Sequence, residues 1–292
     1  MEASLGKGGG SARPSRQDRP QRLGNRLAQR ILGRFPEEAF GLDGRLRDWR
    51  DGLVRGVDPD LVPDDPKLKE RLRLPLSGAA LAVNSFAPWQ ATPGELELLG
   101  LNRFDELRFH IRCPTGVRGT PPRLELLARA GRRLVGVVAL GFDYLAQPRT
   151  RLSAAYWRRA ERGAAEPWLA LLRELDEGAR LRHVDLAALA RLALGLAHSF
   201  PDRPGTLVYL YLEPAGDPLP SPFQRHRDEL ALLARRFART PIAFRYGSFS
   251  SLWRSWRQRR RPVWASPLAA ALADRYEVGG HADDPKASDL EA

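Results

Sequence analysis

Glu125 lies in the short apolar segment RLELLAR (123–129), which a basic turn separates from a second segment, LVGVVAL (134–140). The two segments predict a hairpin of two strands, and a carboxylate on such a hairpin suggests a metal-dependent nuclease site. Half of the required chemistry is missing, because LVGVVAL contains no polar side chain. Glu125 is then either a surviving metal ligand or the polar member of an alternating strand.

Two basic segments have residues suited to contacting phosphate groups. TGVRGTPP (115–122) carries Arg118 between two glycines, which suits a loop beside a DNA backbone and equally an ordinary turn. WRSWRQRRRPVW (253–264) interleaves arginine with tryptophan, so that Trp253 or Trp256 either stacks on bases or faces the core. The arginines of this segment that we expect to contact phosphates are Arg257, Arg259, Arg260 and Arg261.

The histidines and the single cysteine indicate no metal site. Cys113 is the only cysteine, so the chain forms neither an internal disulfide nor a cysteine-based zinc site. His110 is typical of a surface strand. The other histidines show no metal-binding spacing: His183, His198, His226 and His281.

The chain carries a formal net charge of +12, supplied almost entirely by arginine. Such a charge favours a polyanionic partner such as DNA, although abundant Arg, Ala, Gly and Pro also follow from a GC-rich genome. No apolar run approaches the ~18–20 residues that span a bilayer, and the N-terminal residues lack the apolar core of a secretory signal. We therefore expect a cytoplasmic bacterial protein without a membrane association. The lysines are confined to Lys7, Lys67, Lys69 and Lys286.

The composition divides the chain into four parts. Residues 1–22 are rich in Gly, Arg, Ser and Pro and predict a disordered basic tail. Residues 23–66 predict a helical N-terminal extension that ends in a linker. An α/β domain follows over 75–264, and residues 277–292 predict a second disordered tail.

The hydrophobic pattern of the domain alternates between helical and strand periods. Its first helix is expected over 76–89 with Ser77 as the N-cap, and a later helix begins near Asp185. The order of helix, three strands, helix and strand predicts a mixed sheet with helices on its faces. The expected strands are 107–113, the two strands of the hairpin, 205–214 and 241–249; the expected later helical segments are roughly 151–177, 185–200 and 223–239.

Five phrases of the sequence resemble a known family: LSGAALAVNSFAPW, FDELRFHIRCPTGVRGTPPRLELLA, VALGFDYL, LALGLAHSFPDRPGTLVYLYLEP and SSLWRSW. They are similar to uncharacterised bacterial restriction-endonuclease-like proteins of the PD-(D/E)XK nuclease superfamily, over about residues 75 to 256. The predicted element order is also that of the superfamily core. The resemblance implies a site in which carboxylates on neighbouring strands bind Mg²⁺, and a lysine two residues after the second carboxylate stabilises developing charge.

Transferred position by position, the first acid of the family falls on Glu125. The two positions of the Glu-x-Lys motif fall on Val138 and Leu140, which can neither bind a metal nor stabilise charge. A further acid on the preceding strand falls on His110. Asp143 follows the apolar strand and would face away from Leu140 if the strand continued. A glutamine and a nearby lysine of the family's second helix fall on Ala188 and Arg191.

We therefore expect a restriction-endonuclease-like α/β domain that binds DNA but has lost hydrolysis, with Glu125 as a vestige of the catalytic site. Arg118, Arg191 and the four arginines of 257–261 are the expected DNA contacts. No cofactor is expected, except Mg²⁺ if catalysis is retained. One alternative is a non-enzymatic protein-interaction subunit that does not bind DNA. Another is an active endonuclease with a rearranged site, which requires several carboxylates around one cavity. No particular oligomeric state is indicated.

Overall fold

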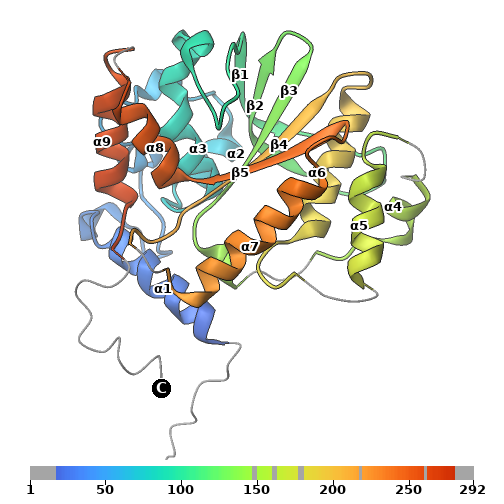
Figure 1. The fold of residues 1–292 in the computed structure, drawn as a ribbon. Helices are drawn as coiled ribbons and strands as arrows, with labels where there is room; N and C mark the ends of the chain where they lie inside the picture. Colours follow the sequence, from blue (N-terminus) through green and yellow to red (C-terminus); the bar gives the residue numbers. More distant parts are fainter. Residues whose placement is uncertain are drawn as a thin grey trace, which may run out of the picture.

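The chain folds around one mixed five-stranded sheet, in the order β1-β2-β3-β4-β5 (Figure 1). The computed structural model describes residues 18–146, 150–159, 163–176, 181–216, 219–259 and 262–279. β1, β2 and β3 pair antiparallel, whereas β3, β4 and β5 run parallel to one another. The strands are β1 (Glu106–Arg112), β2 (Arg123–Ala130), β3 (Arg133–Leu140), β4 (Gly205–Tyr211) and β5 (Ile242–Ser248). The predicted class, an α/β fold with a mixed sheet flanked by helices, is confirmed.

The α-helices of the described residues are α1 (Asp18–Leu32), α2 (Pro66–Leu72), α3 (Gly78–Phe86), α4 (Ala154–Arg159), α5 (Glu166–Asp176), α6 (Leu186–Ser199), α7 (Ser221–Arg236), α8 (Phe249–Arg257) and α9 (Ala265–Tyr276). Short 3-10 turns lie at η1 (Glu37–Ala39), η2 (Trp49–Gly52), η3 (Pro59–Leu61), η4 (Ala87–Ala91), η5 (Pro93–Glu95) and η6 (Asp143–Leu145). None of the helices described has the length and apolar character needed to cross a bilayer.

The predicted capping residues begin their helices as expected. The hydroxyl of Ser77 accepts a hydrogen bond from the backbone N–H of Ala80 at 3.1 Å, and the carboxylate of Asp185 accepts one from Ala188 at 2.9 Å. Each cap satisfies one of the N–H groups that a first helical turn leaves without a partner. Asp65 caps α2 in the same way, ahead of Pro66 at the first helical position.

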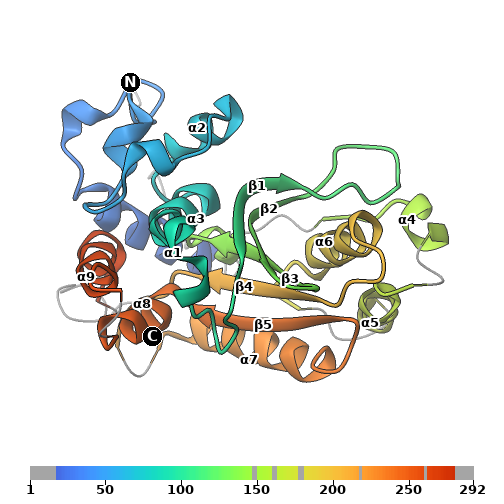
Figure 2. The same cartoon turned by 90° about the horizontal axis from the view of Figure 1, so that it is seen from above.

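Helices cover both faces of the sheet (Figure 2). On one face, α5 places Trp168 against Phe244 of β5, and α7 places His226 against Tyr209 of β4. α3 lies on the other side of the sheet from α7 in Figure 2, and Trp253 of α8 donates a hydrogen bond to Ser85 of α3. β4 is central between two parallel neighbours, which explains why six of its seven residues are buried.

The ordered chain extends beyond the limits that the sequence predicted. α1 begins at Asp18, inside the segment expected to be disordered, and buries Leu27 and Ile31. The expected linker contains η3 and leads directly into α2. The sequence pattern predicts no element for residues 265–276, where α9 buries Leu268 and Leu272.

Arg34 connects the N-terminal segment to the end of α9. Arg34 donates to the backbone oxygens of Asp274 at 2.6 Å and Glu277 at 2.7 Å. A cation at this position also complements the negative end of the helix dipole. Val278 is buried, so residues 277–279, which were expected to be disordered, belong to the folded part.

Candidate functional site

Glu125 forms an ion pair with an arginine that sequence reasoning had left out of the site. Arg71 of α2 donates from Nη2 to Oε1 of Glu125 at 2.7 Å. Only 11% of the Glu125 side chain is exposed, against 42% of the Arg71 side chain. The same Oε1 lies beside the start of α3, where a Cβ on Gly78 would be 3.2 Å away. The carboxylate of Glu125 therefore lies where α2 and α3 meet the sheet.

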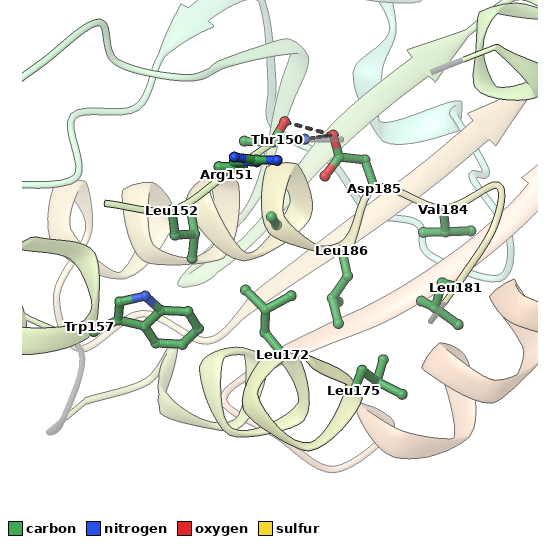
Figure 3. A pocket seen from close by; sticks show the side chains of 11 residues that line it. Thr150, Arg151, Leu152, Trp157, Leu172, Leu175, Leu181, Val184, Asp185 and Leu186 are labelled. Atoms are coloured by element: carbon green, nitrogen blue, oxygen red, sulfur yellow. Dashed lines mark hydrogen bonds between the residues drawn. The ribbon is translucent and has the colours of Figure 1, made fainter. Parts of the chain in front are cut away.

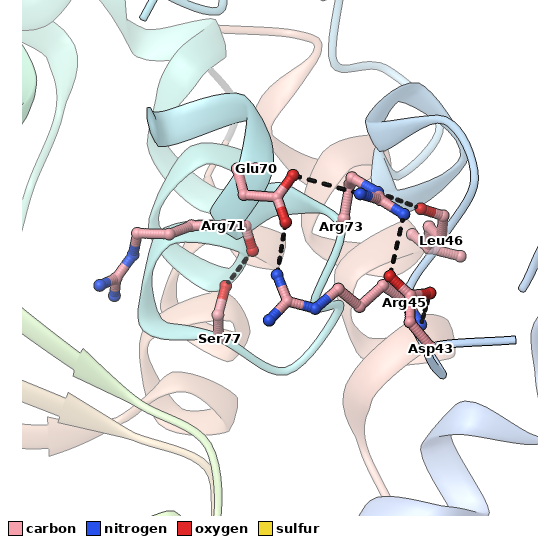
Figure 4. Close-up of polar contacts among 7 residues, drawn as sticks. All are labelled: Asp43, Arg45, Leu46, Glu70, Arg71, Arg73 and Ser77. Carbon is pink, nitrogen blue, oxygen red and sulfur yellow. Dashed lines mark hydrogen bonds and ion pairs between the residues drawn. The ribbon is translucent and has the colours of Figure 1, made fainter. Parts of the chain in front are cut away.

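The α2–α3 turn directs Arg71 toward the sheet (Figure 4). The hydroxyl of Ser77 donates to the backbone oxygen of Arg71 at 2.8 Å, which fixes the backbone of the turn. On the other side of α2, Glu70 pairs with Arg45 and Arg73. Glu70 and Arg71 thus connect α2 to the N-terminal segment on one side and to Glu125 on the other.

Burial raises the pKa of Glu125, because desolvation penalises the charged carboxylate. The guanidinium groups of Arg71 and Arg123 oppose this shift, and the negative charge of Asp143 adds to it. The side chain of Asp143 is partly exposed to solvent. The protein around its carboxyl group nevertheless removes enough water to raise the pKa of Asp143. Sequence reasoning expected Asp143 to face away from the site. β3 ends at Leu140 and the chain turns into η6, so Asp143 does not continue the strand, and its negative charge still acts on the pKa of Glu125.

His110 is buried among polar side chains on the strand beside Glu125, and is not the surface histidine that the sequence predicted. Its backbone φ is +56°, and within β1 it is left out of the register that pairs Phe109 with Leu126 and Ile111 with Leu124. The imidazole is buried, with Nδ1 2.8 Å from Oδ2 of Asp65.

Arg123 and Asp65 together set the tautomer of this imidazole. Nη1 of Arg123 lies 2.7 Å from Nε2 and 3.2 Å from Nδ1 of His110, and an arginine can only donate, whereas the Asp65 carboxylate beside Nδ1 can only accept. Nε2 therefore accepts, and the ring proton lies on Nδ1, directed toward Asp65. Burial lowers the pKa of His110 although Asp65 opposes the shift. We call the residues Asp65, Arg71, His110, Arg123, Glu125 and Asp143 the polar cluster.

β3 supplies no reactive group to the polar cluster. Val138 and Leu140 pair in register with Tyr209 and Tyr211, and the hydroxyl of Tyr209 contacts His226 of α7. Neighbouring residues of paired strands share a face, so Val138 and Leu140 point toward α7 and pack against the core there. The positions of opposite parity, Val135, Val137 and Ala139, are also apolar. The second half of a two-acid-and-lysine site is therefore absent from both faces of this strand.

The polar cluster does not fit Mg²⁺. A magnesium ion prefers an octahedron of oxygen ligands, and Oε1 of Glu125 is already bound to Arg71. Within the part of the chain that the structure describes, no three His, Cys, Asp or Glu side chains are grouped so as to hold a metal ion. The arrangement instead balances three carboxylates against two guanidinium groups and a neutral imidazole.

The predicted DNA contacts fall into two separate groups. Arg118 is exposed in the β1–β2 loop, and Arg191 of α6 donates to the backbone oxygen of Thr120 in the same loop at 2.9 Å. Arg191 also lies over the ring of Tyr156, so it connects α4, α6 and the loop. In Figure 2 this loop and α8 lie at opposite sides of the molecule.

In the second group, Arg259 is engaged with its own chain. Arg259 donates to the backbone oxygen of Glu95 at 2.6 Å and pairs with the carboxylate of Glu97, while Arg257 is exposed. Trp253 and Trp256 are fully buried, so they pack in the core and cannot stack on bases. Arg260 and Arg261 lie outside the described residues, as does His281.

Sequence reasoning also missed a cavity of about 480 Å³ between α5, α6 and the segment that leads into α4 (Figure 3). Its walls are mostly apolar, with Trp157 and Leu172 facing Leu186 across the space. The polar groups at its edge are bonded to each other: Thr150 donates from N and Oγ1 to Oδ2 of Asp185, at 3.0 and 2.6 Å. Because the carboxylate of Asp185 also caps α6, we assign it a structural role rather than a ligand-binding one.

No family model, curated protein or solved structure matches this chain. The resemblance to restriction-endonuclease-like proteins therefore rests on the quoted sequence phrases and on the order of the elements.

Proposed function

We propose that this chain is a restriction-endonuclease-like protein of the PD-(D/E)XK fold that binds DNA without hydrolysing it. Two features support the fold assignment. The order α3, β1, β2, β3, α6, β4, with an antiparallel β1–β3 meander and β4 parallel to β3, is the order that the resemblance implies. Glu125 also stands on β2, where the family's first acid is expected.

The apolar β3 is the observation that carries the loss of hydrolysis. Phosphodiester hydrolysis needs a cation on the scissile phosphate and a group that orients or deprotonates water. Val138 and Leu140 supply neither, and the other face of β3 offers only Val135, Val137 and Ala139. Arg71 does not restore the missing lysine, because its guanidinium stays protonated and cannot transfer a proton. We propose no cofactor.

DNA binding is supported by the charge of +12 and by the exposed Arg118 in the β1–β2 loop. A second candidate function, a protein-interaction subunit that does not bind DNA, is favoured by a different observation. Arg191 and Arg259 donate hydrogen bonds to backbone oxygens of their own chain, which leaves fewer guanidinium groups free to bind phosphates.

Titration of a labelled DNA duplex, followed by fluorescence anisotropy at several salt concentrations, separates the two functions. Binding should weaken with added salt, with a log–log slope of about −0.9 per phosphate contacted. Arg118→Glu should weaken binding more than Arg55→Glu, which makes the same charge change at another exposed position. Absence of binding at low salt would contradict DNA binding and favour the protein-interaction subunit.

A further inference from the structure

A second hollow, of about 270 Å³, lies where the β1–β2–β3 meander meets the end of α6. Leu127 and Leu134 are buried in its floor, and Phe200, directly after α6, is half-buried beside them. The hollow is separate from the polar cluster, and none of the predicted DNA contacts lines it.

Three arginines from different segments line this hollow: Arg108 of β1, Arg129 of β2 and Arg203 in the loop before β4. The β1–β2 register pairs Arg108 with Leu127 and Glu106 with Arg129, which brings the two arginines to one face. We call Arg108, Arg129 and Arg203 the arginine triad.

Carboxylates neutralise the arginine triad only in part. Asp105 accepts from Nε of Arg129 at 2.9 Å, which fixes the direction of that guanidinium. Glu106 is the acidic residue of the lining, and its carboxylate is 3.6 Å from Arg129 and 4.0 Å from Arg108. Arg203 is exposed and makes neither a hydrogen bond nor an ion pair with the described part of the chain. Three cations therefore face two carboxylates, and one guanidinium is available to a ligand.

We propose that the arginine triad binds a phosphate group. Guanidinium groups match the oxygens of phosphate in a bidentate fork, and Arg129 is already held in place. The apolar floor lowers the local dielectric and so strengthens charge pairing above it. A volume of about 270 Å³ lies just below the ~300–1,000 Å³ of pockets for drug-sized ligands, so it holds a phosphate group together with part of the molecule that carries it. The inference does not depend on the proposed function, because the phosphate is either that of a nucleic-acid backbone or that of a small phosphorylated molecule.

Thermal unfolding with inorganic phosphate, compared with chloride at equal ionic strength, tests the site directly. Phosphate should raise the Tm of the wild type, since a ligand that binds only the native state stabilises it. The double variant Arg108→Ala/Arg203→Ala should lose most of this rise. The control Arg55→Ala/Arg239→Ala, which removes two exposed arginines elsewhere, should keep it. Equal shifts in the wild type and in the triad variant, or no shift in the wild type, would overturn the proposal.

DNA titration of the same variants identifies the source of the phosphate. If the triad contacts a nucleic-acid backbone, the double variant should lower the salt slope by about one per arginine removed. If DNA binding is unchanged while the phosphate effect is lost, the site takes a small phosphorylated molecule. If no variant binds DNA but the phosphate effect remains in the wild type and the control, the proposed DNA-binding function fails and the phosphate site stands.

Discussion

The ion pair between Arg71 and Glu125 determines what the Glu125 carboxylate can do. A carboxylate that is 11% exposed needs a partner, and Arg71 is the one that hydrogen-bonds to it. Two buried atoms of the pair, Nε of Arg71 and Oε2 of Glu125, find no hydrogen-bond partner in the described residues. The pair therefore supplies Glu125 with a counter-charge and leaves its carboxylate poorly suited to bind a metal.

Removing Arg71 should destabilise the protein in a pH-dependent way. Arg71→Leu leaves the Glu125 carboxylate buried without its cation and should cost about 1–3 kcal/mol. The pKa of Glu125 is already raised in the folded state and should rise further in this variant. A raised carboxyl pKa means that the folded state holds the proton more tightly, so the cost should grow as pH rises through that pKa.

Urea unfolding at a mildly acidic and a mildly basic pH measures this effect. Arg45→Leu is the matched control, because its partner Glu70 is an exposed carboxylate and such pairs contribute about 0–1 kcal/mol. Equal costs for Arg71→Leu and Arg45→Leu, or a cost independent of pH, would show that Glu125 does not depend on Arg71.

His226 should make the fold less stable in acid. It is fully buried against Tyr144 and Tyr209, and burial lowers its pKa to about 3. The unfolded chain takes up this proton below pH ~6.5, whereas the folded chain does not, so stability falls by about 1.4 kcal/mol per pH unit below that value. The loss should reach about 2 kcal/mol at pH ~5.

His226→Gln should flatten this part of the pH profile of the unfolding free energy. Tyr209→Phe removes the hydrogen bond to Nε2 but leaves the imidazole buried, and should keep the slope. The interpretation is wrong if both variants show the wild-type slope.

At the scale of elements, the α2–α3 turn joins the N-terminal segment to the sheet. Gly78 begins α3 so close to β3 that a Cβ would overlap the backbone oxygen of Ala139. Only glycine fits this close contact, which places the start of α3 beside the Glu125 carboxylate.

Gly78→Ala should therefore cost at least about 1–3 kcal/mol, because the overlap is with backbone and the helix must shift. Gly33→Ala, at the end of α1, meets its nearest atom at an ordinary 3.4 Å and should change stability by less than about 1 kcal/mol. Thermal or urea unfolding of the two variants measures the difference. A Gly78→Ala protein as stable as Gly33→Ala would contradict the close packing of α3 on β3.

Local patterns predicted the elements that depend on local chemistry. Ser77 and Asp185 cap the expected helices, and the apolar run LVGVVAL forms β3. α9 escaped prediction because its sequence, ASPLAAALADRY, has a weak pattern, and its ends are fixed by residues distant in the sequence such as Arg34. The positive φ of His110 gave no signal in the sequence either, because histidine in a run of alternating residues is typical of a regular strand.

At the scale of the whole molecule, the polar cluster is assembled from both sides of the predicted domain boundary. Asp65 and Arg71 come from the extension and α2, ahead of the expected start at residue 75, whereas Glu125 and His110 come from the sheet. Arg71 and Glu125 are 54 positions apart, and no local pattern connects residues at that separation. The apolar nature of β3 could be predicted, and the partners of Glu125 and His110 could not.

We propose above that this chain binds DNA without hydrolysing it. Incubation of the purified protein with supercoiled plasmid and Mg²⁺ or Mn²⁺, read on an agarose gel, tests it most directly. Glu125→Ala is the matched control, because it removes the acid at the family's first catalytic position. The plasmid should stay supercoiled with both proteins. Nicked or linear plasmid that appears with the wild type and disappears with Glu125→Ala would contradict the account.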